Sequence, residues 1–216
     1  SHLTLLAQNR EGYHNLIKMI SIANLEGFYY KPRVDKEILE NYGKGVIALT
    51  GCLSGKMNRL LLRDKDAEAL EWVEFLKHCF PQVYVEMGRI NVPEAEQLIP
   101  RQIAIAKQAG LKYVATCDSH YLDQEDYKIQ EIAWCISDGK KLVDPERRQF
   151  ASTEFYVKSA KQMRELFTDH PEAVNNTYEI AESVEQYGVE FERIQPKWDA
   201  KLKENEIREL LQKHVY

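Results

Sequence analysis

The chain has 216 residues, of which 44% are hydrophobic and 29% are charged, and this composition is typical of a soluble globular protein. No apolar run approaches the roughly 20 residues of a membrane span and no signal peptide opens the chain, so we expect a cytoplasmic protein without membrane contact. A formal net charge of −5 excludes the global basic surface of most stand-alone nucleic-acid binders, so any polynucleotide contact must be local or belong to a larger assembly.

Short apolar runs of strand type alternate with amphipathic helical patterns over the first 139 residues. The predicted strands are residues 2–7, 46–50, 83–87 and 113–118. The predicted helices are residues 11–24, 35–41, a long region that ends near 80, and one that ends near 109, where Gly110 suits a left-handed cap. Strands separated by helices favour parallel pairing and helices that cover the sheet. We therefore expect an α/β fold over residues 1–139, either part of a βα barrel or an open sheet.

Beyond residue 139 an exposed connector leads into two further predicted helices, one capped by Ser159 and one opened by Pro171. Residues 140–190 are therefore expected to form a connector and a small helical appendage. Residues 191–216 carry a charged helical pattern with little apolar mass, and we expect a linker or the start of a further region.

The strand predicted after residue 112 ends on an Asp and a His that are two residues apart. Side chains alternate between the faces of a strand, so Asp118 and His120 are expected to leave the strand end on the same side. A carboxylate oxygen and an imidazole nitrogen can together hold a divalent metal. Short motifs are weak, however, and the alternative is that Asp118 caps a turn and His120 is a solvated loop residue.

Cys52 follows Gly51 at the end of another predicted strand. A thiolate at such a position could bind a soft or borderline metal, whereas a lone buried cysteine is usually a small apolar filler. Spacing alone favours the filler.

The loop at residues 27–33 combines three aromatic residues with Lys31 and Arg33. These residues could contact a phosphate backbone and stack on bases, which makes Lys31 and Arg33 candidate DNA contacts. Since no basic stripe is found elsewhere, a packing loop is the favoured interpretation. Glu86, inside a predicted strand, is interpreted as a salt-bridge partner rather than a site residue.

Several ordered blocks resemble the PHP (polymerase and histidinol phosphatase) domain of bacterial DNA polymerase III α subunits. The blocks are HLTLLAQN (2–9), GYHNL (12–16), EGFYYKPRVD (26–35), VIALTGCLSG (46–55), VATCDSHYL (114–122), DGKKLVDP (138–145), FYVKS (155–159), MRELF (163–167) and EAVNNT (172–177). The resemblance covers about residues 2–190.

The resemblance implies a distorted seven-stranded βα barrel that holds up to three divalent metals (Zn, Mn or Mg), with a small helical appendage. The metal-ligand positions that it carries over to this chain are His2, Cys52, Asp118 and His120. His2 stands at the start of its predicted strand instead of following the end of one, and Ser-His is also what a cleaved tag leaves, but the HLTLLA block favours a native histidine. The family's other ligands, including an HxH motif, are not present in this sequence.

We therefore expect an internal fragment of a replicative DNA polymerase, with an incomplete barrel and an incomplete metal cluster. The Mg-binding polymerase site is expected outside this chain, which thus carries no catalytic residue for polymerisation and is expected to be inactive alone. DNA and replisome subunits are the expected partners of the full-length parent. Exposed sheet edges could also pair two copies of the fragment.

Three functions are compatible with these observations. The parent's PHP metals could hydrolyse phosphodiesters in a proofreading or pyrophosphatase-like reaction, with metals about 3.5–4 Å apart. Alternatively, the domain could be a scaffold that positions the polymerase core or binds a proofreading subunit, with structural metals. A stand-alone amidohydrolase-like or histidinol-phosphatase-like enzyme is the third possibility, and the blocks after Gly139 argue against it.

Overall fold

The computed structural model describes residues 1–189 and 203–215. Its strands are β1 (Thr4–Ala7), β2 (Val46–Leu49), β3 (Gln82–Gly88) and β4 (Lys112–Thr116). Its helices are α1 (Arg10–Leu25), α2 (Lys36–Tyr42), α3 (Lys56–Leu61), α4 (Asp66–Cys79), α5 (Pro93–Ala109), the 3₁₀ turn η1 (Gln124–Asp126), α6 (Tyr127–Asp138), α7 (Ala160–Leu166), α8 (Pro171–Ser183) and α9 (Glu204–Val215). The predicted α/β class is confirmed.

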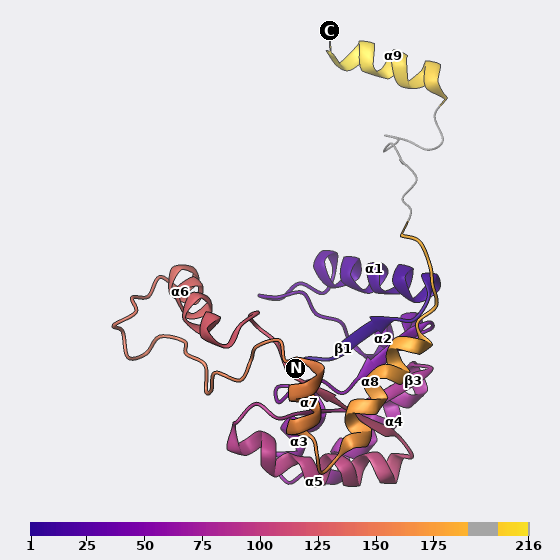
Figure 1. The fold of residues 1–216 in the computed structure, drawn as a ribbon. Helices are drawn as coiled ribbons and strands as arrows, with labels where there is room; N and C mark the ends of the chain where they lie inside the picture. Colours follow the sequence, from indigo (N-terminus) through magenta and orange to yellow (C-terminus); the bar gives the residue numbers. More distant parts are fainter. Residues whose placement is uncertain (190–202, 216) are drawn as a thin grey trace.

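The described strands form one open sheet in the order β1-β2-β3-β4, and they do not close into a barrel (Figure 1). β2 and β4 both run parallel to β3, as predicted. The prediction is wrong for β1, which is antiparallel to β2 and places Thr4 opposite Leu49. β1 is an edge strand joined to β2 by two helices and a long loop, and such a connection can return the chain at either end of the sheet.

Apolar side chains fill both faces of the sheet. On one face, Val46, Ala48 and Val83 belong to a cluster with residues of α1, α2 and α4. On the other face, Ile180 of α8 packs with four strand residues: Ile47, Leu49, Tyr84 and Val114. Helix α8 thus covers the sheet directly, although its sequence lies far beyond the last strand.

Helix α6 and the extended segments that flank it project from the body of the molecule (Figure 1). Most residues between α6 and residue 150 are exposed. The projection has its own contacts, since Arg147 Nη1 lies 2.7 Å from Glu131 Oε2 and the Phe150 ring packs on Trp134 with centroids 4.3 Å apart.

Local signals in the sequence placed several helix ends correctly. Gly110 closes α5 in the left-handed conformation with φ 66°, and the Ser159 side chain caps α7. The long helix predicted to end near residue 80 is instead two helices, α3 and α4, separated by a turn in which Asp64 has φ 57°.

A linker or the start of a further region was predicted over residues 191–216. Of these, residues 191–202 lie outside the described residues, and α9 occupies most of the remainder. Among the helices of residues 1–189 and 203–215, none combines the length and apolarity needed to cross a membrane.

Candidate metal centre

The antiparallel direction of β1 brings His2 to the end of β2. Because the two strands run in opposite directions, the start of β1 lies beside the turn that follows β2. His2 forms an isolated bridge with Gly55, and its backbone N–H donates to the Ser54 carbonyl oxygen at 3.4 Å. His2, which lies just before β1, is therefore close to Cys52, which lies just after β2.

The side chains of His2, Cys52 and Ser54 form a compact polar group. His2 Nδ1 lies 3.8 Å from Cys52 Sγ and 3.1 Å from Ser54 Oγ, and the Cys52 and Ser54 side chains are 3.2 Å apart. Burial raises the pKa of the Cys52 thiol, an effect that hydrogen bonding from Ser54 only partly opposes. Without a bound cation this sulfur is therefore a protonated thiol at neutral pH.

Gly51 is required for this approach of the two chain segments. Its φ of 87° lies in the left-handed region, and a Cβ at this position would be 2.7 Å from the His2 carbonyl oxygen. The glycine thus allows the turn to close against the start of β1.

A chain of buried amide side chains supports the turn from below. The Asn58 side-chain NH₂ donates to the carbonyl oxygens of Cys52 at 3.0 Å and Gly51 at 3.3 Å. Its Oδ1 accepts from Gln102 Nε2 at 3.0 Å, and the same Gln102 nitrogen donates to the Glu86 carbonyl oxygen at 3.2 Å. The sequence analysis did not predict these hydrogen bonds between Asn58, Gln102 and the backbone. A polar Asn among the apolar residues of α3 could have indicated a buried hydrogen-bonding role.

Glu86 is a buried carboxylate held by hydroxyl groups. Thr4 Oγ1 and Thr116 Oγ1 each donate to one of its carboxylate oxygens at 3.0 Å. Burial raises the pKa of Glu86, the two threonine hydrogen bonds partly oppose the rise, and the negative charge of Asp118 adds to it. The interpretation of Glu86 as a salt-bridge partner is wrong, because no cationic side chain in the described chain pairs with it.

One small cavity connects several of these groups. Its polar lining is contributed by Cys52, Asn58, Glu86, Gln102, Thr116 and Asp118. Its volume of about 20 Å³ is sufficient for one water-sized particle. Gln102, one of the lining residues, has a buried Oε1 without a hydrogen-bond partner among the described residues.

Asp118 and His120 lie on the loop after β4 and not on the strand itself. β4 ends at Thr116, and Asp118 has a φ of 45°, so the alternation of faces that predicted their common side does not extend to them. His120 Nδ1 lies 2.6 Å from the Asp118 carbonyl oxygen, and its ring meets Phe150 and Phe155 edge to face. When Nδ1 donates to that carbonyl, Nε2 carries the lone pair that could bind a metal.

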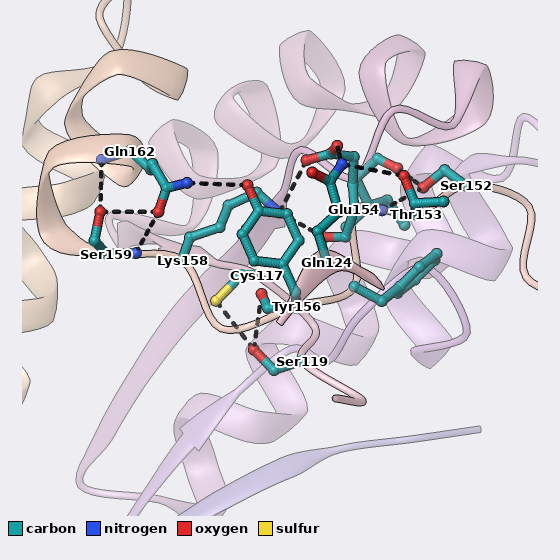
Figure 2. A network of polar contacts seen from close by, with 12 residues as sticks. Cys117, Ser119, Gln124, Ser152, Thr153, Glu154, Tyr156, Lys158, Ser159 and Gln162 are labelled. Atoms are coloured by element: carbon teal, nitrogen blue, oxygen red, sulfur yellow. Dashed lines mark hydrogen bonds and ion pairs between the residues drawn. The ribbon is translucent and has the colours of Figure 1, made fainter. Parts of the chain in front are cut away.

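The loop that carries Asp118 and His120 is anchored to the segment before α7 (Figure 2). The Ser119 hydroxyl lies 3.2 Å from Cys117 Sγ and donates to the Tyr156 carbonyl oxygen at 3.4 Å. A parallel bridge between Tyr121 and Tyr156 continues the contact. The position of the predicted ligand loop therefore depends on residues far along the chain.

The anchoring segment has its own polar network (Figure 2). The buried Lys158 ammonium lies 3.1 Å from the Glu154 carboxylate and 4.0 Å from the centroid of the Tyr156 ring. Gln162 Nε2 donates to the Tyr156 hydroxyl at 3.2 Å and its Oε1 accepts from Ser159. The Tyr156 side chain is thus held at its hydroxyl by Gln162 and at its ring by Lys158.

The arrangement supplies only part of the metal site that the resemblance implies. Among the His, Cys, Asp and Glu side chains of residues 1–189 and 203–215, no three are placed to hold one ion. The structure brings His2 to Cys52 and places Cys52 and Asp118 on one cavity, but it does not join His120 to them. An imidazole nitrogen and a thiolate suit zinc, so the His2 and Cys52 pair fits two of its four usual positions.

The candidate DNA contacts Lys31 and Arg33 are not part of this group of residues. They lie on the exposed loop between α1 and α2.

Comparisons with known proteins agree with the sequence resemblance. Residues 1–89 match the family model described as the PHP domain. The chain is 39% identical over 191 residues to the DNA polymerase III subunit alpha of Borreliella burgdorferi, which covers 88% of this chain and 17% of the relative. It is 37% identical to that of Treponema pallidum over 221 residues (100% of this chain, 19% of the relative) and 38% identical to that of Helicobacter pylori over 195 residues (84% and 16%).

The chain thus spans less than one fifth of the length of these relatives. The matches also include most of the sequence after residue 89, and they share one protein name. Over most of its length the chain is therefore similar to one segment of DNA polymerase III alpha subunits, and its residues 1–89 match the PHP domain.

Proposed function

We propose that this chain is part of the catalytic alpha subunit of a replicative DNA polymerase that acts in the cytoplasm, and that its PHP domain contributes to a divalent-metal site. The observation that carries the metal site is the approach of His2 Nδ1 to Cys52 Sγ at 3.8 Å. These atoms come from opposite ends of two antiparallel strands, and a glycine and two buried amides maintain the turn that holds them.

In the longer protein we infer that further strands complete the predicted barrel and that residues outside this chain complete the ligand set with Asp118 and His120. The open sheet of four strands and the two-donor pair support this inference. The Mg-binding polymerase site, the DNA and the other replisome subunits are proposed for the full-length protein, without membrane contact.

The residues of this chain prepare the site for a cation. Cys52 and Glu86 both have pKa values raised by burial, and the Asp118 carboxylate raises both further. A positive ion near Cys52 would relieve this repulsion and favour the thiolate form. A bound divalent ion would supply Lewis-acid polarisation of a phosphodiester, and Asp118 and His120 would orient it from the neighbouring loop.

A structural role is the second candidate, and one specific observation favours it. The two donors that converge join the edge strand β1 to the turn after β2, so an ion bound by them would fix β1 to the sheet. In that case the domain serves as a scaffold for the polymerase core or a proofreading subunit. Association of two copies through sheet edges stays a prediction that light scattering would check.

The two roles are separated by assays on the full-length protein. Metal content, primer extension and hydrolysis of a 3′-mismatched primer would be measured for the wild type, Asp118→Ala and Cys52→Ser. The catalytic role predicts that Asp118→Ala loses hydrolysis and retains extension. If the hydrolysis rate is unchanged in a protein that has lost its metal, the metal is not catalytic.

A further inference from the structure

The loop between α1 and α2 exposes a cluster of aromatic side chains that the metal centre does not use. The exposed fractions are 60% for Phe28, 64% for Tyr29 and 82% for Tyr30, and these three residues are called the aromatic tip below. Figure 1 shows this loop extending beyond the end of α1. Three neighbouring rings are thus left in solvent, and each could bury a large apolar area against a partner.

The aromatic tip has a defined shape. Tyr30 lies at its turn with φ 58°, and the Tyr29 N–H donates to the Lys31 carbonyl oxygen at 3.2 Å across that turn. The two sides of the loop meet where Gly27 packs against Arg33, since a Cβ on Gly27 would lie 2.2 Å from the Arg33 carbonyl oxygen. These contacts give the backbone that carries the rings a defined turn.

Two cations accompany the rings. The Arg33 guanidinium lies 5.1 Å from the centroid of the Tyr29 ring, which in turn meets Tyr30 edge to face at 4.6 Å. Within residues 1–189 and 203–215, neither Lys31 nor Arg33 forms an ion pair. The Asp35 carboxylate accepts from the Ile38 N–H at 3.0 Å as the cap of α2. An external anion can therefore approach both cations.

We propose that the aromatic tip binds single-stranded nucleic acid, with Tyr29 and Tyr30 stacking on bases and Lys31 and Arg33 contacting phosphates. Sequence-tolerant single-strand sites combine these two features, an aromatic platform and nearby positive charge. Bases inside a duplex are stacked on their neighbours and must be unstacked before a side chain can insert, so a projecting ring stacks more readily on unpaired bases. The choice of a nucleic acid as the partner, and not a protein surface, rests on the proposed function.

Fluorescence anisotropy with the 216-residue chain would test the proposal. The probes are a labelled oligo(dT) of about 16 nucleotides, the length of a large single-strand site, and a duplex of the same length. We expect the single strand to bind more tightly than the duplex. Tyr30→Asn removes the ring and keeps a residue that tolerates positive φ, and it should weaken single-strand binding about 5- to 150-fold. Tyr178→Asn, which changes an exposed tyrosine of α8, should leave the affinity unchanged.

A charge test is independent of the rings. The double variant Lys31→Gln/Arg33→Gln should reduce the dependence of log affinity on log salt by about 0.7 for each phosphate that the protein no longer neutralises. Equal binding of duplex and single strand, no measurable binding, or equal effects of Tyr30→Asn and Tyr178→Asn would each overturn the proposal. The tip variants retain His2 and Cys52, so a zinc titration of the same proteins tests the metal proposal separately.

Discussion

His2 Nδ1 and Cys52 Sγ lie 3.8 Å apart although 50 residues separate them in the chain. The contact depends on the direction of β1, because a parallel β1 would carry His2 to the opposite end of the sheet. Antiparallel pairing of the edge strand is therefore the structural feature that makes these two residues a candidate ligand pair.

Replacing Gly51 should damage both the turn and the pair. In Gly51→Ala the new Cβ meets the His2 carbonyl oxygen at 2.7 Å, and the backbone has a positive φ that alanine disfavours. We expect the free energy of unfolding to fall by about 1–3 kcal/mol and the zinc affinity to fall with it. Gly88→Ala is the matched control, because a Cβ there would have only an ordinary contact at 3.8 Å. Similar urea midpoints for the two variants would contradict this account of the turn.

The buried amide chain should be important for stability. Asn58→Ala removes the donor to the Cys52 and Gly51 carbonyl oxygens and leaves Gln102 without one of its acceptors. Loss of several buried hydrogen bonds predicts a decrease of about 2–4 kcal/mol in the free energy of unfolding, measured by urea denaturation. Asn24→Ala, at an exposed position near the end of α1, should change it by no more than about 0.5 kcal/mol.

Glu86 should make the free energy of unfolding decrease as the pH rises. Because burial raises the pKa of Glu86, the folded chain keeps the proton over a range in which the unfolded chain has released it. The stability contribution is complete below the unfolded pKa and is lost as the pH rises through the folded pKa.

The free energy of unfolding is measured by urea denaturation at a series of pH values that spans the unfolded and folded pKa values of Glu86. A chelator is present so that no metal contributes. Glu86→Gln should show a smaller decline in stability with rising pH than the wild type. The exposed substitution Glu125→Gln serves as the control and should reproduce the wild-type dependence. Parallel curves for the wild type and Glu86→Gln would show that this carboxyl does not titrate differently in the two states.

Much of the fold was predictable because its signals are local. The apolar runs that became β2, β3 and β4 stand between amphipathic helices, and Gly110 and Ser159 mark helix ends that the structure confirms. The direction of β1 was not predictable in the same way, since an edge strand presents the same apolar pattern whichever way it runs.

The candidate site shows a similar division. Cys52 and Asp118 follow strand ends and do line one cavity. The face shared by Asp118 and His120 could not be read from alternation, because the positive φ of Asp118 interrupts the extended backbone. The roles of Asn58 and Gln102 depend on contacts between α3, α5 and the turn after β2, which spacing in the sequence does not encode.

Zinc titration of the 216-residue chain against a chromophoric chelator tests whether His2 and Cys52 are part of an incomplete metal site. We expect at most one zinc ion per chain, bound weakly, and loss of that binding in both Cys52→Ser and His2→Ala. Four candidate donors can complete no more than one tetrahedral site. Tight binding of two or three zinc ions, or binding unchanged in both variants, would contradict this expectation.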